Sequence, residues 1–510
     1  MRVRRSLWNF LSMMVLMVVT MLVGIKASPL LTFWLGEGPF GAVQVMKDAT
    51  GLLTLLELGL SGALGPLMIR SIGLNNEVDL QKAVVAGSRS YLRVSLSIII
   101  VGLALTPTVS WFTRGLTAAE VNDLRLAWVV GLGVFVPMTL LPLRSVIEAE
   151  QRGYIINLLL TAQSLLMTGM ALTLARSRWG ITGQSIALVT AVWIFHVILA
   201  TMVFRAHPGL FKQCLTAPAD PQTRKAMRGL SWPVLLINIF GRLGMLTDNL
   251  VIARGLGAGR VTSLFYTQRL VVLGQLVLQG IGNATWAALA DLHAKGEVAL
   301  FNRRLIELSR LVSMLAAVGL GPVIAYNHAF FRLWANVGEV YEGDFVVVVA
   351  SVNVFLVSLQ SLWCWCFTAT GQVRRIVPLT IAGAVLNLSA SIILVNYVGV
   401  VGPLLGTSLG LGLVGLWVLP LQLKWTFGTS PLSMVKAVLP SFIWALASAS
   451  MLWWLTRFHQ PTTWLALAFE MSVAALLSLA FSVAFLLSPE ERSMWRARLL
   501  PASFRQGTSA

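Results

Sequence analysis

The sequence predicts an all-α polytopic membrane protein of about fourteen transmembrane helices, arranged as two pseudo-symmetric six-helix bundles plus two C-terminal helices. Three observations predict this class: a very apolar composition, a succession of apolar runs of spanning length, and a weak internal repeat. Of 510 residues, 57% are hydrophobic and 11% are charged, whereas soluble domains carry about 25% charged residues. A soluble core could not bury so much apolar surface, so lipid is the solvent that accounts for the composition.

Apolar runs follow one another along almost the whole chain. Because a spanning helix needs about 20 mainly apolar residues, they predict helices near 7–34, 40–68, 86–110, 124–147, 154–175, 181–204, 230–254, 261–289, 305–333, 345–369, 375–396, 401–425, 433–456 and 463–487. The second and eighth runs are long and polar. The first run is longer than the apolar core of a signal peptide, so it predicts an uncleaved helix.

The distribution of positive charge predicts the orientation of the chain. The net charge is +18, and Lys and Arg concentrate in the loops on one side of the predicted spans. This asymmetry is typical of cytoplasmic loops beside anionic lipid, and it explains the basic composition without nucleic acid. We expect a multi-pass protein of the bacterial inner membrane with both termini in the cytoplasm.

A proline-containing loop and a weak repeat divide the chain. The loop at 206–229 is a cytoplasmic linker between an N-terminal lobe (1–205, helices 1–6) and a C-terminal lobe (230–426, helices 7–12). Helices 13 and 14 and a cytoplasmic tail occupy 427–510. Residues 35–38 correspond to 256–259, and 180–183 correspond to 399–402. Two six-helix units that both begin inside predict a parallel repeat about an axis along the membrane normal.

Ionisable residues lie within several predicted spans, where they are costly unless they face protein or water. They fall mainly on helices 1, 2, 7 and 8 and comprise Lys26, Lys47, Asp48, Glu57, Arg242, Asp248 and Arg269. Polar residues at helical spacing accompany them, among them Asn238, Gln275 and Gln279. These polar stripes predict a water-accessible cavity and movement of a solute across the bilayer.

Other roles are open for the individual charges. Lys26, Asp248 and Arg254 lie toward the outer ends of their predicted helices, where side chains can reach the interface. Asp48 and Arg269 occupy equivalent positions in the repeat and could pair as a strut or gate. Glu57 and Arg242 lie near mid-span, where a purely structural role explains an ionisable residue least well.

The sequence gives little support to metal or cofactor chemistry. Cys364 and Cys366 form a C-x-C within an apolar helix, and Cys214 stands alone. The five histidines are scattered without zinc-ligand spacing. We expect no metal site, no cofactor and no enzyme activity.

Three short segments are similar to those of a transporter family. They are Leu58-Gly59-Leu60-Ser61-Gly62-Ala63 within 52–70, Trp34-Leu35-Gly36 with Pro39-Phe40-Gly41, and Gly180-Ile181-Thr182-Gly183. With these segments the chain resembles the multidrug/oligosaccharidyl-lipid/polysaccharide exporter superfamily, in its branch of Wzx-type lipid-linked oligosaccharide flippases (polysaccharide biosynthesis proteins).

The resemblance implies a V-shaped pair of bundles that alternates between inward- and outward-facing states, with helices 1, 2, 7 and 8 along the cleft. The implied substrate is an undecaprenyl-diphosphate-linked glycan, with glycosyltransferases and a polysaccharide polymerase as partners. The residues then expected to bind substrate are Lys26, Lys47, Asn238, Arg242, Arg269, Gln275 and Gln279. The residues expected in gating, or in coupling to a proton or sodium ion, are Asp48, Glu57 and Asp248.

Several alternative functions stay open. A cation-coupled multidrug exporter of the same superfamily would favour twelve helices and an acidic cavity. A flippase for the peptidoglycan lipid precursor would have the same helix count. A membrane glycosyltransferase or polymerase would need a larger outer loop than the one around Glu339, Glu342 and Asp344. A purely structural scaffold would leave Glu57 and Arg242 unexplained.

Overall fold

A computed structural model describes residues 2–57, 60–74, 76–218, 220, 231–335, 341–487 and 491–493. These residues form helices, and no strand occurs among them, so the predicted all-α class is confirmed. Contacts divide the described chain into two compact units. Unit 1 contains residues 2–264 and 384–406, and unit 2 contains 265–335, 341–383 and 407–493.

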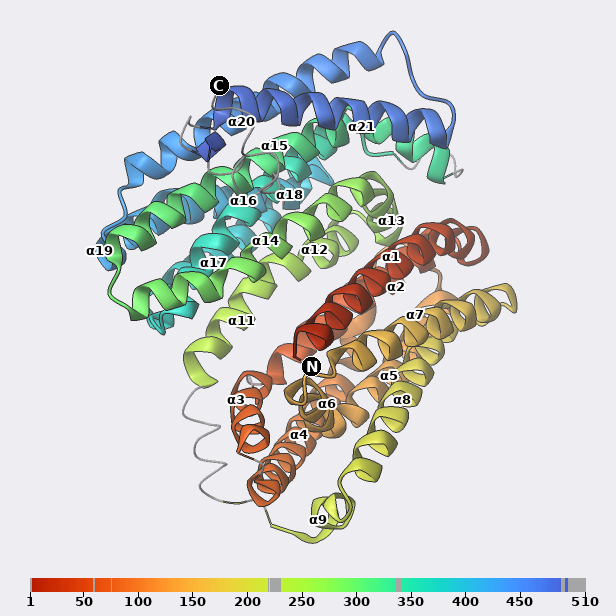
Figure 1. The fold of residues 1–510 in the computed structure, drawn as a ribbon. Helices are drawn as coiled ribbons and strands as arrows, with labels where there is room; N and C mark the ends of the chain where they lie inside the picture. Colours follow the sequence, from red (N-terminus) through yellow and green to blue (C-terminus); the bar gives the residue numbers. More distant parts are fainter. Residues whose placement is uncertain are drawn as a thin grey trace. The chain divides into compact units, whose positions relative to one another are not determined.

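Unit 1 begins with nine α-helical segments joined by short turns and 3-10 segments (Figure 1). They are α1 (Arg2–Leu35), α2 (Glu37–Leu53), η1 (Thr54–Glu57), α3 (Leu60–Gly73), α4 (Glu77–Leu105), η2 (Thr106–Trp111), α5 (Ala118–Gly131), η3 (Leu132–Leu140), α6 (Leu141–Ala149), α7 (Gly153–Arg176), α8 (Gly180–Ala206) and α9 (Leu210–Thr216). It also contains α11 (Ser231–Leu246), α12 (Asp248–Gly255) and most of α13 (Ala258–Thr267). Helix α1 packs along α7, where Asn9 accepts a hydrogen bond from the backbone of Tyr154 (2.6 Å).

Unit 2 is centred on the long helix α15, which packs against α16, α20 and α21. Its helices are α14 (Arg269–Ala294), α15 (Val298–Ala335), α16 (Asp344–Ala369), η4 (Val373–Arg375), η5 (Gly410–Val418), α19 (Leu419–Phe427), α20 (Pro431–Thr456), α21 (Trp464–Phe481) and η6 (Ser482–Leu486). Helices α17 (Val377–Val398) and α18 (Val401–Leu409) are divided between the two units. The units thus differ from the lobes expected at 1–205, 230–426 and 427–510, which rest on the repeat rather than on contacts and stay a prediction.

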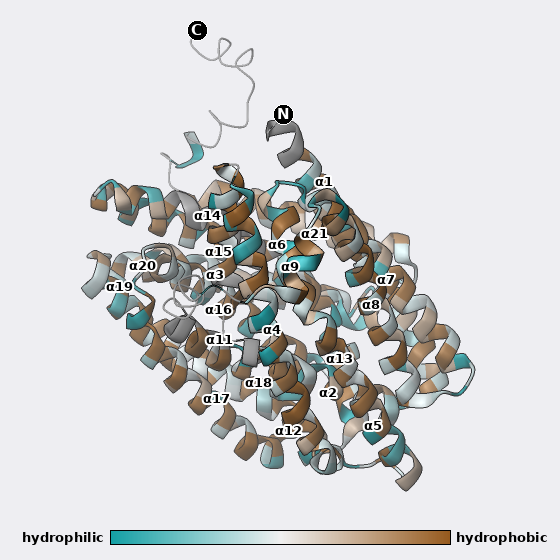
Figure 2. Cartoon of the chain, turned by 90° about the horizontal axis from the view of Figure 1, so that it is seen from below, coloured by the Kyte–Doolittle hydropathy of each residue, from teal (hydrophilic) through white to brown (hydrophobic). Residues whose placement is uncertain are grey.

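Every predicted span falls on helical structure. Among the described residues, eleven helices are long and apolar enough to cross a membrane, and the bent pair α11 and α12 brings the number to twelve. The other two predicted spans, near 40–68 and 261–289, coincide with the broken segments α2–η1–α3 and α13–α14. Figure 2 shows apolar residues along most helical turns, and large apolar side chains such as Phe33 and Leu465 are 79% and 83% exposed. Such a surface is suited to lipid.

Three predicted spans are broken rather than continuous. Helix α2 ends at Leu53 and the 3-10 segment η1 follows it, so the span predicted at 40–68 is not one continuous α-helix. Helices α11 and α12 are bent by 43° at Thr247. The Thr247 hydroxyl donates to the carbonyl of Leu243 (2.7 Å), a bond that favours bending. Helices α13 and α14 meet in a turn at Gln268.

The glycines in the turns that define the repeat have positive φ in both copies. Gly36 and Gly257 have φ of 87° and 104°, and Gly180 and Gly399 have φ of 56° and 66°. L side chains rarely adopt such positive φ values. The corresponding turns of the two halves therefore share a glycine with positive φ.

The turn that begins α8 is fixed by an aspartate from α5. Asp123 accepts hydrogen bonds from the backbone N–H groups of Ile181 (2.6 Å) and Thr182 (3.2 Å). A side chain at Gly180 would overlap this carboxylate. The Gly180–Thr182 motif is therefore explained by capping of a helix N-terminus, because a carboxylate there satisfies free N–H groups and the helix dipole.

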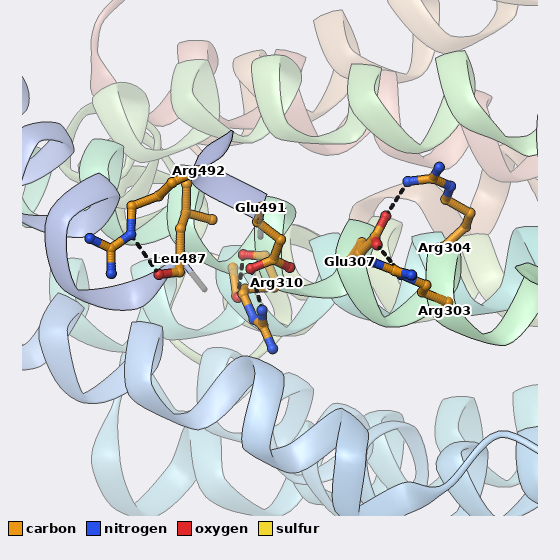
Figure 3. Close-up of polar contacts among 8 residues, drawn as sticks. Arg303, Arg304, Glu307, Arg310, Leu487, Glu491 and Arg492 are labelled. Carbon is orange, nitrogen blue, oxygen red and sulfur yellow. Dashed lines mark hydrogen bonds and ion pairs between the residues drawn. The ribbon is translucent and has the colours of Figure 1, made fainter. Parts of the chain in front are cut away.

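Unit 2 carries an arginine–glutamate network at the N-terminal end of α15 (Figure 3). Glu307 accepts from Arg303 (3.0 Å) and Arg304 (2.5 Å). One turn further along, Arg310 is ion-paired with Glu491, which follows α21 and is 8% exposed. This network ties the segment at 491–493 to α15.

Candidate functional site

Three of the four predicted phosphate-binding cations are exposed. Lys26 lies on α1, Lys47 on α2 and Arg242 on α11. An exposed charge on a spanning helix is expensive against hydrocarbon and is explained by water or a bound anion. These three side chains are therefore accessible to a ligand.

The fourth predicted cation, Arg269, is the first residue of α14 in unit 2. Its guanidinium lies 5.3 Å from the ring centroid of Phe265. Its Nε is buried and has no hydrogen-bond partner among the described residues. A positive charge at a helix N-terminus opposes the helix dipole, and a buried N–H without an acceptor costs free energy. Arg269 is thus poorly explained by stability and well suited to an incoming anion.

Asp48 joins α2 to α12 within unit 1. Its carboxylate accepts a hydrogen bond from the side-chain amide of Asn249 (2.6 Å). Both side chains are half-buried. Since a protonated carboxyl accepts hydrogen bonds less well than a carboxylate, this contact responds to the protonation of Asp48.

Asp248, the second acidic residue expected in coupling, begins α12 immediately after the bend. A carboxylate in the first turn of a helix stabilises it through the helix dipole by about 0.5 kcal/mol. This placement gives Asp248 a structural explanation that Arg269 lacks.

The structure describes the side chains of only some of the predicted site residues. Gln275 is half-buried on α14, in the same helix as Arg269. The side chains of Glu57, Asn238 and Gln279 lie outside the described residues. Their roles stay predictions.

Four segments of unit 1 are joined by hydrogen bonds to backbone carbonyls that the sequence did not predict. The N–H of Arg114 donates to the carbonyl of Ala253 (3.1 Å), and the N–H of Ala258 donates to the carbonyl of Arg114 (2.9 Å). The hydroxyl of Thr262 donates to the carbonyl of Glu37 (2.7 Å). We call these five residues the Arg114 clasp. It connects the loop after η2 and the start of α2 to α12 and α13.

Gly41 makes the clasp sterically compatible with α2. A Cβ atom at Gly41 would overlap the backbone carbonyl of Ala258. The residue at this position must therefore lack a side chain for the two backbones to approach so closely. The segment Pro39-Phe40-Gly41 contained this signal, but its contact with a helix more than two hundred positions away could not be read from it.

A cavity of about 580 Å³ lies within unit 1 beside the clasp. Its walls come from α2, the end of α4, η2, α5, α12 and α17, and most of its lining is apolar. The polar side chains in the lining are Thr108, Thr113, Arg114, Thr247, Arg254 and Asn396. The guanidinium of Arg254 lies 4.9 Å from the ring centroid of Trp111. Of the two arginines, Arg254 was expected from the sequence near a helix end at the interface, and Arg114 was not singled out.

Comparison with solved structures shows which known proteins share this fold. The lipid II flippase MurJ, in an inward closed conformation, superposes with a TM-score of 0.69 at 14% identity, over 95% of this chain and 98% of that one. An inward-facing multidrug resistance transporter of the MATE family, in the MOP superfamily, gives 0.59 at 17% identity, over 85% and 95%. A MOP superfamily transporter from Pyrococcus furiosus gives 0.57 at 17% identity, over 87% and 96%. The chain has the fold of the MOP superfamily transporters.

This likeness confirms the expected fold at the level of the superfamily. No family model matches the sequence, and no curated protein matches it. The identities of 14–17% establish a shared architecture only. They establish neither the Wzx branch nor the substrate.

Proposed function

We propose that the protein is a flippase that moves an undecaprenyl-diphosphate-linked oligosaccharide across the bacterial inner membrane by alternating access, for surface polysaccharide biosynthesis. The observation that carries the proposal is its likeness, over 95% of the chain, to a structure named as a lipid II flippase. The MATE multidrug transporter covers 85% of the chain. The lipid II flippase structure therefore matches a larger part of this chain than the MATE transporter structure does.

The accessible cations support an anionic substrate. Lys26, Lys47 and Arg242 are exposed on helices of unit 1, and Arg269 has a buried Nε without an acceptor among the described residues. Lysine and arginine bind phosphate oxygens through charge-assisted hydrogen bonds. A diphosphate that links a glycan to an isoprenoid provides several such oxygens, and the isoprenoid can remain in lipid during transfer.

The same features weigh against a drug exporter of this fold. A cavity that selects cationic drugs would use carboxylates, and the lining of the unit 1 cavity contains none among the described residues. We propose that protonation of Asp48, or binding of sodium near it, weakens its bond to Asn249 and so biases the transport cycle. Glu57 stays a second candidate for this coupling.

The flippase for a peptidoglycan precursor is the main alternative, because the structure named as a lipid II flippase shares the fold. We favour the oligosaccharide-linked lipid on the Wzx-like segments at 34–41, 52–70 and 180–183. Both termini are proposed to lie in the cytoplasm, with glycosyltransferases and a polymerase as functional partners.

Complementation tests the proposal. The gene is expressed in a strain that lacks its own oligosaccharide flippase, and surface glycan and membrane protein level are measured. Arg242→Ala should abolish surface glycan at unchanged protein level, because an exposed phosphate-binding cation is lost, while Arg242→Lys should restore part of it. Arg144→Ala is the matched control, since Arg144 is paired with Glu148 (2.9 Å) and should be dispensable.

Each outcome has a distinct meaning. Full surface glycan with Arg242→Ala would refute the role of Arg242. Rescue of a strain depleted of its peptidoglycan-precursor flippase, without rescue of surface glycan, would establish the alternative substrate. Increased drug resistance on overexpression, with neither rescue, would favour the exporter.

A further inference from the structure

The unit 1 cavity is cationic at one end and mostly apolar along the rest of its length. Arg114, Arg254 and Asn396 lie at the end that carries the clasp. Leu388 lies just over two helical turns before Asn396 on α17, which places it about 12 Å deeper. The cavity volume of about 580 Å³ is in the range of sites that enclose a small molecule.

The polar end is built for an anion. Its lining contains two arginines and, among the described residues, no carboxylate. Thr113, in the lining beside Arg114, is 5% exposed, and its hydroxyl has no hydrogen-bond partner among the described residues. A buried hydroxyl without a partner costs free energy that a bound acceptor would recover. Phosphate oxygens are such acceptors, and arginine binds them in a forked geometry.

The mouth of the cavity is flanked by side chains that suit hydrocarbon. Leu105, Trp111 and Ile392 line it and are 38%, 61% and 52% exposed. Trp111 precedes a loop, the position at which tryptophan marks the boundary between hydrocarbon and headgroups. A molecule that enters from the bilayer therefore meets an apolar slot beside a cationic end.

We propose that this cavity binds an anionic phospholipid from the membrane leaflet at the clasp end. Its phosphate contacts Arg254, Arg114 and the Thr113 hydroxyl, and one acyl chain occupies the apolar interior. Zwitterionic lipids fit less well, because no carboxylate among the described lining residues would face their ammonium group. This site is separate from the exposed cations assigned to the transported substrate.

The bound lipid would stabilise the clasp. The cavity walls include η2, α2 and α12, which the clasp and the Asp48–Asn249 bond already join. A ligand that contacts all three elements binds only while they are together, and it stabilises that state by mass action. Anionic lipid would thus favour the conformation in which this end of unit 1 is closed.

Binding to the purified full-length protein tests the proposal, with phosphatidylglycerol and phosphatidylethanolamine as probes. Phosphatidylglycerol should bind saturably and raise the melting temperature, and Arg254→Gln should weaken it about tenfold, the effect of one charge-assisted hydrogen bond. Thr113→Val, which preserves side-chain shape, should weaken it by a smaller factor. Ala49→Phe should block binding by filling the cavity, which Ala49 lines.

The chain provides a matched control. Arg457 lies 3.9 Å from the ring centroid of Trp453, the same stacked arrangement as Arg254 on Trp111, but it does not line the cavity. Arg457→Gln should leave phosphatidylglycerol binding unchanged. Equal binding of the two phospholipids, or full binding by both Thr113→Val and Ala49→Phe, would overturn the proposal. Arg254-dependent binding of undecaprenyl phosphate without phosphatidylglycerol binding would assign the site to an isoprenoid lipid instead.

Discussion

The arginine side chains at the start of α15 are paired with carboxylates. In the unit 1 cavity, by contrast, one arginine side chain stacks on an aromatic ring and the other arginine is hydrogen-bonded through its backbone. In unit 2, Arg303 and Arg304 share Glu307, and Arg310 pairs with Glu491 (Figure 3). In unit 1, Arg254 stacks on Trp111, and the backbone of Arg114 forms the clasp. Stacking fixes a guanidinium and leaves its N–H groups available.

This difference distinguishes arginines that stabilise the fold from arginines whose side chains are available to a ligand. A guanidinium paired with a carboxylate has its charge compensated within the protein and contributes to local order. A guanidinium that faces a cavity retains donors for a ligand. Positive charge by itself is therefore a poor guide to function in this chain, and the partner of each arginine is informative.

The two regions also differ in how their elements are joined. The segment at 491–493 is tied to α15 by side-chain charges, while the clasp depends on uncharged hydrogen bonds to backbone carbonyls and on the close approach of Gly41 to Ala258. Backbone contacts between helix ends can separate without leaving a charge buried, which suits a gate. A buried ion pair cannot separate so cheaply.

The largest effect is expected at Gly41. Gly41→Ala places a methyl group where the Ala258 carbonyl lies, so a backbone must move, and we expect destabilisation of about 3 kcal/mol or loss of the clasp. Equilibrium unfolding of the purified protein in mixed micelles, followed by tryptophan fluorescence, measures the change.

Gly259→Ala is the control for this substitution. Gly259 lies on α13, one residue after Ala258, and nothing lies within 4 Å of the position of its Cβ. Because alanine favours a helix over glycine by up to about 1 kcal/mol, this variant should be neutral or slightly stabilised. Equal stability of the two variants would mean that the close approach of Gly41 does not hold the clasp.

A smaller loss is expected at Glu491. Glu491→Gln removes the charge opposite Arg310, whose side chain is 23% exposed, and leaves a largely buried guanidinium without its counter-ion. We expect destabilisation of about 2 kcal/mol. The control is Glu148→Gln, since the Arg144–Glu148 pair is 39% and 48% exposed and such pairs contribute little. If both variants lose the same free energy of unfolding, the buried Arg310–Glu491 pair contributes no more to stability than the exposed pair does.

The fold was largely predictable from the sequence because hydropathy reports what faces lipid. The fourteen predicted spans fall on helical structure, and the glycines that marked the repeat have positive φ in both copies. The breaks were not predictable. The bend at Thr247 accompanies contacts from distant helices, including the amide of Asn387, which donates to the carbonyl of Gly244 (2.9 Å).

The candidate site was predictable only in part. Embedded charges such as Asp48 and Arg269 stood out, because hydrocarbon makes them costly. Asn249, which donates a hydrogen bond to Asp48, was not among the predicted site residues. Arg254 and Thr113 gave no signal, since an arginine and a threonine near helix ends are ordinary at a membrane interface, and only the packing of α17 beside α2 and α12 turns them into a cavity wall.

The smallest effect tests whether the α15 network acts as a unit. Arg303 is 63% exposed, and its partner Glu307 keeps a second contact to Arg304 (2.5 Å). Arg303→Gln should therefore change the free energy of unfolding by no more than about 0.5 kcal/mol. The same unfolding titration measures it beside Glu491→Gln. A loss as large as that of Glu491→Gln would show that the charges on this end of α15 are coupled, and that the exposed arginine anchors the helix as strongly as the buried pair does.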